Sequence, residues 1–132
     1  MEVDYLLVED VVALHDYALD LYGGTPGREP GKLEGTLSLP DSGFGDYERF
    51  PLIEEKAAVY HYYLASGHCF TDGNKRTSYL AAFTFLDING YDLVASDEEV
   101  YNWTHKIADD KTRPPFFEAV VWIGTHMHKR EE

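Results

Sequence analysis

Apolar side chains recur at every third or fourth position along most of this sequence, which is the spacing of amphipathic helices. In the first half of the chain this pattern predicts three helices, over 10–21, 32–39 and 50–66. Glycine or proline follows each of them, and both residues stop helices. The stretches between them, 25–31 and 41–46, are rich in turn-forming residues and are expected to be loops.

The strongest apolar pattern lies over 74–89. Apolar side chains surround this predicted helix almost completely, and a helix of that kind is usually buried at the centre of a fold. Asn89 and Gly90 supply a stop at its C-terminal end. A short extended segment over 91–95 is expected to follow it.

The last third of the chain carries signals that start helices. A Ser-x-x-Glu capping box predicts a helix over 96–108. Thr112 is expected to cap a final helix that has Pro114 and Pro115 in its first turn. The charged tail, 128–132, is expected to fray.

These elements predict an all-α protein. The 132 residues, of which 44% are hydrophobic, are enough for one domain with its own core, so we expect a single domain over 1–132. Cys69 is the only cysteine, which excludes an internal disulfide and fits a reducing cytoplasm.

The charge balance excludes several classes of partner. Lysine and arginine number 11 against 24 aspartates and glutamates, which gives a net charge of −13. Such a surface has little attraction for nucleic acid or anionic lipid. No apolar run approaches the roughly 20 residues that span a bilayer, and the first residues lack the basic end of a signal peptide, so we expect a cytoplasmic protein. The acidity fits life in high salt, although an ordinary acidic cytoplasmic protein has the same character.

Chemistry-bearing side chains concentrate in one nine-residue segment, 68–76, which reads HCFTDGNKR. It runs into the N-terminus of the predicted helix over 74–89, where free N–H groups and the helix dipole favour a bound anion. The backbone at Gly73 can approach an anion closely, because glycine has no β-carbon. Three neighbouring side chains supply further donors: Asn74, Lys75 and Arg76.

Two titratable residues in the same segment add reactive groups. Asp72 is a candidate ligand for Mg²⁺, and His68 is a candidate base that takes a proton from a hydroxyl. Together with the anion site they suit the binding and transfer of nucleotide phosphate. The alternative is structural: Asp72-Gly73-Asn74 is only a turn and a helix cap, and His68 caps the preceding helix. Phe70 is interpreted as a packing anchor that holds the loop. Cys69, beside the candidate base, is interpreted as a packing residue rather than a nucleophile.

The sequence HCFTDGNKR matches the pattern H-x-F-x-[DN]-[AG]-N-K-R, and at these residues the chain resembles the Fic/Doc family. The segments 13–16 and 22–27 are similar to the amino-terminal part of the Doc (death-on-curing) toxins, and so is the helix that ends at Asn89. The resemblance covers 10–95.

This resemblance implies a compact helical bundle around a central buried helix, with ATP and Mg²⁺ as ligands. It implies His68 as the catalytic base and Asp72 as the Mg²⁺ ligand. The implied phosphate site consists of Gly73, Asn74, Lys75 and Arg76, the last two also acting in catalysis by neutralising phosphate charge.

The resemblance also implies a biological role. Doc toxins phosphorylate a threonine of the translation elongation factor Tu and so stop protein synthesis, and an antitoxin blocks them with its carboxy-terminal segment. The chain is therefore expected to be a toxin and protein kinase acting on a translation elongation factor. Its expected partner is an antitoxin whose helical segment lies in an apolar groove.

Two alternatives remain open. Fic enzymes transfer AMP instead of phosphate; the last arginine of their motif is replaced here by Tyr79, and Lys75 stands where glycine is usual, which favours the kinase. The Asp72-Gly73 pair is common among AMP-transferring members and keeps that activity open. The other alternative is an inactive binding module. The inhibitory pattern [ST]-x-x-x-E-[GN] is not met at Glu34, so restraint is expected from a separate antitoxin.

Overall fold

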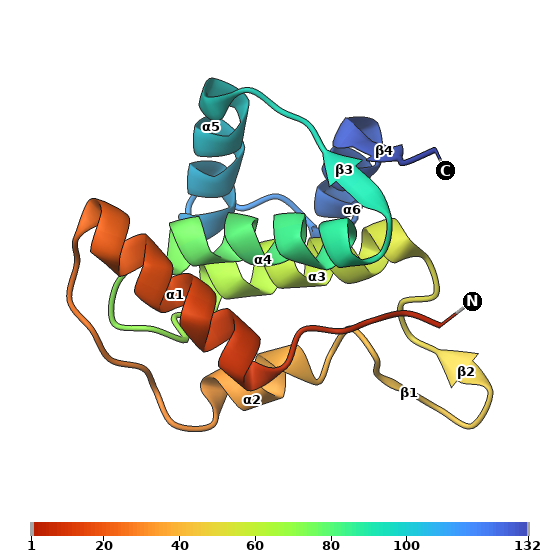
Figure 1. Ribbon diagram of the computed structural model, residues 1–132, viewed down its shortest axis with the longest axis horizontal. Helices are drawn as coiled ribbons and strands as arrows, with labels where there is room; N and C mark the ends of the chain where they lie inside the picture. Colours follow the sequence, from red (N-terminus) through yellow and green to blue (C-terminus); the bar gives the residue numbers. More distant parts are fainter. Residues whose placement is uncertain (1, 132) are drawn as a thin grey trace.

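The computed structural model of the chain describes residues 2–131, and over these residues it contains six helices and two short two-stranded sheets (Figure 1). The prediction of an all-α fold is confirmed. The helices are α1 (Val8–Tyr22), α2 (Lys32–Leu37), α3 (Ile53–Ser66), α4 (Asn74–Ile88), α5 (Asp97–Ala108) and α6 (Phe116–His126). The strands are β1 (Gly43–Phe44), β2 (Tyr47–Glu48), β3 (Tyr91–Leu93) and β4 (Met127–Lys129).

Two antiparallel helices, α3 and α4, lie side by side at the centre, and the other helices pack around them (Figure 1). The rings of Tyr60 and Phe85 meet across this pair with their centroids 4.9 Å apart. The apolar pattern of α4 predicted a helix covered on all sides, but Phe83 and Ile88 are 42% and 44% exposed. The more completely buried helix is α3, because α5 and α6 cover the faces that α4 leaves free.

The first helix crosses one end of the α3–α4 pair. A segment before α1 ties the chain to the centre, because the Tyr60 hydroxyl accepts a 3.1 Å hydrogen bond from the Leu6 N–H. From there α1 runs to the end of the pair at which α4 begins (Figure 1). The loop predicted over 25–31 then leads to α2. This course places the C-terminal end of α1 beside the start of α4, where the candidate site lies.

The predicted capping box at the start of α5 is confirmed: Glu99 N–H donates to the Ser96 hydroxyl at 3.1 Å, and Ser96 N–H donates to the Glu99 carboxylate at 3.0 Å. The predicted cap of the final helix is wrong. The Thr112 hydroxyl donates to the Lys106 carbonyl at 2.9 Å instead, and α6 begins after Pro115.

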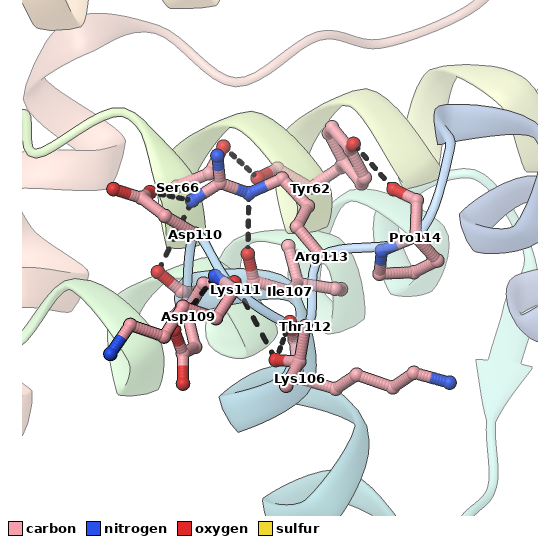
Figure 2. A network of polar contacts seen from close by, with 11 residues as sticks. Tyr62, Ser66, Lys106, Ile107, Asp109, Asp110, Lys111, Thr112, Arg113 and Pro114 are labelled. Carbon is pink, nitrogen blue, oxygen red and sulfur yellow. Dashed lines mark hydrogen bonds and ion pairs between the residues drawn. The ribbon is translucent and has the colours of Figure 1, made fainter.

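A network of polar contacts fixes the turn between α5 and α6 (Figure 2). Arg113 Nε donates to the last turn of α5 at the carbonyl of Ile107, 2.6 Å away, and the same guanidinium pairs with Asp110 at 2.9 Å. The Tyr62 hydroxyl of α3 donates to the Pro114 carbonyl at 2.7 Å. The turn is therefore anchored both to α5 and to the central helix.

The predicted fraying of 128–132 is wrong for the described part of that tail. Residues of β4 pair antiparallel with β3, with Leu93 opposite Met127, and Arg130 N–H donates to the Gly90 carbonyl at 2.9 Å. Residue 132 lies outside the described residues. A second hairpin, β1–β2, occupies part of the loop expected over 41–46. Neither ribbon has the length to give a periodic pattern in the sequence.

Over residues 2–131, no helix combines the length and the apolar character needed to cross a bilayer.

Candidate functional site

The segment 68–76 forms the loop between α3 and α4, together with the first turn of α4. Gly67 ends α3, and the next residue, His68, is exposed and has a φ of 52°, which is a conformation rare outside glycine. Cys69 and Phe70 are buried. Cys69 and Phe70 therefore anchor the loop in the interior, while His68 remains exposed and accessible to a large partner.

The Asn74 side chain closes this loop. Its Oδ1 accepts a 3.0 Å hydrogen bond from the Phe70 N–H, and its Nδ2 donates to the Phe70 carbonyl at 2.9 Å. Both polar ends of the amide are thus used to hold the loop. Asn74 retains two donors for an anion, its backbone N–H at the start of α4 and the second N–H of Nδ2.

A second chain segment runs beside the loop and pairs with it. Thr71 N–H donates to the Gly27 carbonyl at 2.9 Å, and Glu29 N–H donates to the Cys69 carbonyl at 2.9 Å. A β-carbon at Gly27 would lie 2.9 Å from the Thr71 hydroxyl, so this close approach requires glycine. The proline- and glycine-rich segment 25–31 is therefore a support for the candidate site and not a free loop.

The exposed carboxylate of Asp72 is fixed from two sides. Its Oδ2 accepts the Thr25 N–H at 3.1 Å, and its Oδ1 accepts the Gly73 N–H at 2.9 Å. These backbone hydrogen bonds, the one from Thr25 first, lower the pKa of Asp72 below its ordinary value. The carboxylate is therefore ionised at neutral pH. The N-cap of α4 is Gly73, within the turn and helix cap that the alternative interpretation places at Asp72-Gly73-Asn74, and no side chain caps this helix.

A buried histidine on α1 lies behind the loop. The His15 ring stacks on Phe70 with centroids 3.8 Å apart and an interplanar angle of 9°. Its Nε2–H donates to the Asp72 carbonyl at 2.7 Å. His15 supports the backbone at Asp72, and a β-carbon added to Gly73 would meet its ring at 3.4 Å.

The start of α4 is a concentration of positive charge in an acidic protein. Gly73 has a φ of 79°, and beyond it lie the unpaired N–H groups of the first helical turn. Lys75 and Arg76 are exposed there, and within the described range 2–131 neither has a carboxylate oxygen within 4.0 Å. Together these groups form a site for an anion.

A cleft of about 650 Å³ opens at this point, lined by residues of α1, α4 and α5 and of the loop before α4. Five of the six predicted site residues line it, and the sixth, His68, is not among its described lining residues. The cleft is lined at the start of α4 by Asp72, Gly73, Asn74, Lys75 and Arg76, and elsewhere by Tyr17, Leu21, Tyr22, Tyr79, Leu80, Asp97, Val100, Tyr101, Thr104 and His105.

The sequence did not indicate a role for Tyr22, the last residue of α1. The Arg76 guanidinium carbon lies 4.0 Å from the centroid of its ring. No spacing rule connects these residues, because they belong to different helices. The interpretation of Cys69 as a packing residue fits the structure, since its side chain is fully buried and its Sγ lies 3.6 Å from the Thr36 hydroxyl.

Comparison with known proteins gives the class of this chain. A sequence model of the Fic/DOC family matches residues 5–86. The chain is 37% identical over 91 residues to "Protein kinase doc" of Escherichia phage P1, which covers 68% of this chain and 71% of that protein. It is 37% identical over 92 residues to "Toxin Doc" of Mycolicibacterium smegmatis, which covers 70% of this chain and 69% of that protein.

The chain belongs to the Fic/DOC family, and the resemblance indicated by the motif over 68–76 is confirmed. The matched range contains α1 to α3 and nearly all of α4, which together hold the candidate loop. Helix α5, which forms one wall of the cleft, lies beyond it.

Proposed function

We propose that this chain is the toxin of a toxin–antitoxin pair and a protein kinase of the Doc type. Both relatives carry the Doc name, one as a toxin and the other as a protein kinase. The observation that carries the proposal is the uncapped start of α4, with Lys75 and Arg76 beside it and Asp72 and His68 in the loop before it. The proposed reaction moves the γ-phosphate of ATP to a threonine or serine hydroxyl of another protein.

The arrangement fits the phosphates of ATP. Phosphoryl transfer depends mainly on positioning and on neutralising charge, and little on covalent help from the protein. The free N–H groups of the α4 first turn, beginning at Asn74, give a fixed set of donors. Lys75 and Arg76 add two positive charges that no described carboxylate within 4.0 Å cancels. Local positive charge is needed for a phosphate group to bind to a protein whose net charge is −13.

Asp72 suits the role of Mg²⁺ ligand. Its carboxylate is exposed and ionised, and each of its oxygens accepts one backbone hydrogen bond while keeping a second acceptor position. Mg²⁺ prefers carboxylate oxygen together with phosphate oxygen and, when bound, would neutralise charge on the triphosphate.

His68 suits the role of base. In the proposed step the hydroxyl oxygen of the target attacks the γ-phosphorus, and the bond from that phosphorus to the bridging oxygen of ADP breaks. The hydroxyl proton passes to the His68 imidazole, and the products are a phosphoprotein and ADP. Because His68 is exposed at the start of the loop, a protein substrate can reach it. The proposed target is a translation elongation factor in the cytoplasm.

The remainder of the cleft has side chains that suit the nucleobase of ATP and, as an alternative occupant, an antitoxin helix. Aromatic side chains of Tyr17 and Tyr101 line it and supply faces for a nucleobase. Its aliphatic residues, Leu21 and Leu80 among them, suit the apolar face of an antitoxin helix. An antitoxin in this cleft would exclude the nucleotide.

Parallel labelling reactions test the proposal. Purified protein, Mg²⁺ and cell extract are incubated in low and high salt with ATP labelled at either the α- or the γ-phosphate, with His68→Ala as the matched control. We expect one protein band labelled by the γ form only, and no label with His68→Ala. Label from the α form would mean AMP transfer and contradict the kinase. Equal label, or none, with both proteins would support an inactive binding module.

The antitoxin proposal has its own test. Co-expression with the product of the neighbouring gene should give a stable complex and relieve toxicity. The substitution Leu80→Asp, in the aliphatic part of the cleft, should weaken that complex. Failure to form a complex, with toxicity unchanged, would contradict it.

A further inference from the structure

Tyr22 holds Arg76 without cancelling its charge. The guanidinium carbon lies 4.0 Å from the centroid of the tyrosine ring, and both side chains line the cleft. An aromatic face attracts a cation through its quadrupole, so the ring restrains the long side chain while leaving its positive charge available. A carboxylate partner would restrain the side chain equally well but would neutralise it.

Three of the other four arginines pair with carboxylates, and the fourth, Arg49, lies over the ring of Phe50 at 5.1 Å. Arg28 pairs with Glu34 at 3.4 Å, Arg113 pairs with Asp110 at 2.9 Å, and Arg130 pairs with two aspartates. Carboxylates are abundant in this chain, with 24 acidic residues against 11 basic ones. A flexible arginine on such a surface is readily drawn to one of them. At Arg76 the neutral ring of Tyr22 takes that place.

The backbone on either side of Tyr22 is fixed relative to the site. Tyr22 is the last residue of α1, and the turn that follows is held by a 2.7 Å hydrogen bond from Gly23 N–H to the Leu19 carbonyl. Three residues beyond Tyr22, Thr25 N–H donates to the Asp72 carboxylate at 3.1 Å. One turn of chain therefore orients both the candidate Mg²⁺ ligand and the support of Arg76.

We propose that Tyr22 is a positioning residue that holds the Arg76 guanidinium, fully charged, for the phosphates of the bound nucleotide. This inference rests on the proposed function, because it takes the anion at the start of α4 to be the triphosphate group of a nucleoside triphosphate. It goes further by giving a role to a residue of α1 that has no part in the chemical step.

Binding measurements with a double-mutant cycle test it. The probes are a non-hydrolysable ATP analogue and tripolyphosphate, each with Mg²⁺, titrated into the wild type and into Tyr22→Leu, Arg76→Ala and the double variant. We expect Tyr22→Leu to weaken both probes about two- to fivefold, the range expected for an exposed cation–π contact. The conservative Tyr22→Phe should bind like the wild type. In the Arg76→Ala background, Tyr22→Leu should have no further effect.

Each other outcome is decisive. An equal loss from Tyr22→Leu with and without Arg76, or a loss for the ATP analogue but not for tripolyphosphate, would mean that the ring packs α1 or stacks on the base, and would overturn the inference alone. No binding of either probe to the wild type would overturn it together with the proposed function. Tyr47→Leu, an exposed tyrosine on β2, controls for loss of a surface ring, and Tyr22→Met replaces Tyr22→Leu if the latter unfolds.

Discussion

The Nε2–H of His15 donates a 2.7 Å hydrogen bond to the backbone carbonyl of Asp72, and this bond links two residues that are 57 positions apart in the sequence. It joins α1 to the loop before α4. Because Asp72 presents its carboxylate beside that carbonyl, the position of the candidate Mg²⁺ ligand depends on a helix that contributes no catalytic group.

We predict that His15→Phe impairs activity more than it impairs folding. Phenylalanine can keep the stacking on Phe70, but it leaves the Asp72 carbonyl without its donor. The loss should lower the free energy of unfolding by about 1–2 kcal/mol, which is typical of one partly buried hydrogen bond. Urea unfolding and the γ-phosphate transfer assay measure the two effects. The control Asp16→Asn changes an exposed carboxylate 4.0 Å from the other ring nitrogen and should alter neither. An active, destabilised His15→Phe protein would contradict the positioning role.

Asn74→Ala should loosen the loop. It removes both hydrogen bonds to the buried Phe70 backbone, and the orphaned amide costs about 1–3 kcal/mol of unfolding free energy. We expect a lower melting temperature and weaker binding of the Mg²⁺–ATP analogue. The control is Asn102→Ala, an exposed asparagine on α5, which should be neutral or slightly stabilising because alanine favours helices. Equal melting temperatures for the two variants would show that the contacts to Phe70 do not hold the loop.

The fully buried His61 should make stability depend on pH. Burial lowers its pKa from 6.5 to about 3, so the folded protein keeps this ring neutral where the unfolded chain binds a proton. Its contribution is complete above pH 6.5 and is lost as the pH falls below that value. At pH 5.5 the loss should be on the order of 1 kcal/mol relative to pH 7.5.

Urea unfolding at these two pH values measures that loss, and both lie above the sequence pI of about 4.7. The variant His61→Gln should reduce the difference, since glutamine does not titrate and can still reach the hydroxyl of Thr104, which His61 Nε2 contacts at 2.8 Å. An unchanged pH difference in His61→Gln would show that another group is responsible.

Added salt should raise the melting temperature. The net charge of −13 produces self-repulsion, and an ionic strength near 1 M shortens its range to about 3 Å. We expect a rising melting temperature between 0.1 and 2 M KCl, measured by calorimetry. Sucrose at matched osmolarity is the control, since it does not screen charge. A flat or falling curve in KCl would favour the interpretation as an ordinary acidic protein over that of a halophile.

The helices could be predicted from the sequence because their signals are local. The capping box at Ser96 depends on a residue only three positions away, and the hydrogen bonds it predicted are present. The final helix shows the limit of such signals. Threonine is a residue type that often caps helices, but the Thr112 hydroxyl donates a hydrogen bond to the Lys106 carbonyl near the end of α5. The last carbonyl groups of α5 lack partners within the helix and therefore accept such bonds.

The ribbons depend on partners that the sequence does not reveal. Strand β4 is only three residues long, and its pairing is decided by β3, more than 30 positions earlier. The same holds for the candidate site. The motif over 68–76 indicated which residues carry chemistry, but it did not indicate that the Asn74 side chain would form hydrogen bonds to the Phe70 backbone. Nor did it indicate that Tyr22 would lie against Arg76.

The attachment of α1 to the loop has a consequence for how the molecule opens. The hydrogen bonds from His15 and Thr25 to Asp72 span 57 and 47 residues, whereas the α3–α4 pair is joined by one short loop. A transient release of α1 would dissolve the cleft while the central pair stays closed. In native-state hydrogen exchange, the amide of Thr25, which bonds to the Asp72 carboxylate, should then have an opening free energy below that of amides within α3. A ligand that touches both α1 and α4 would raise that value, so occupancy of the cleft would be readable from the protection of the loop.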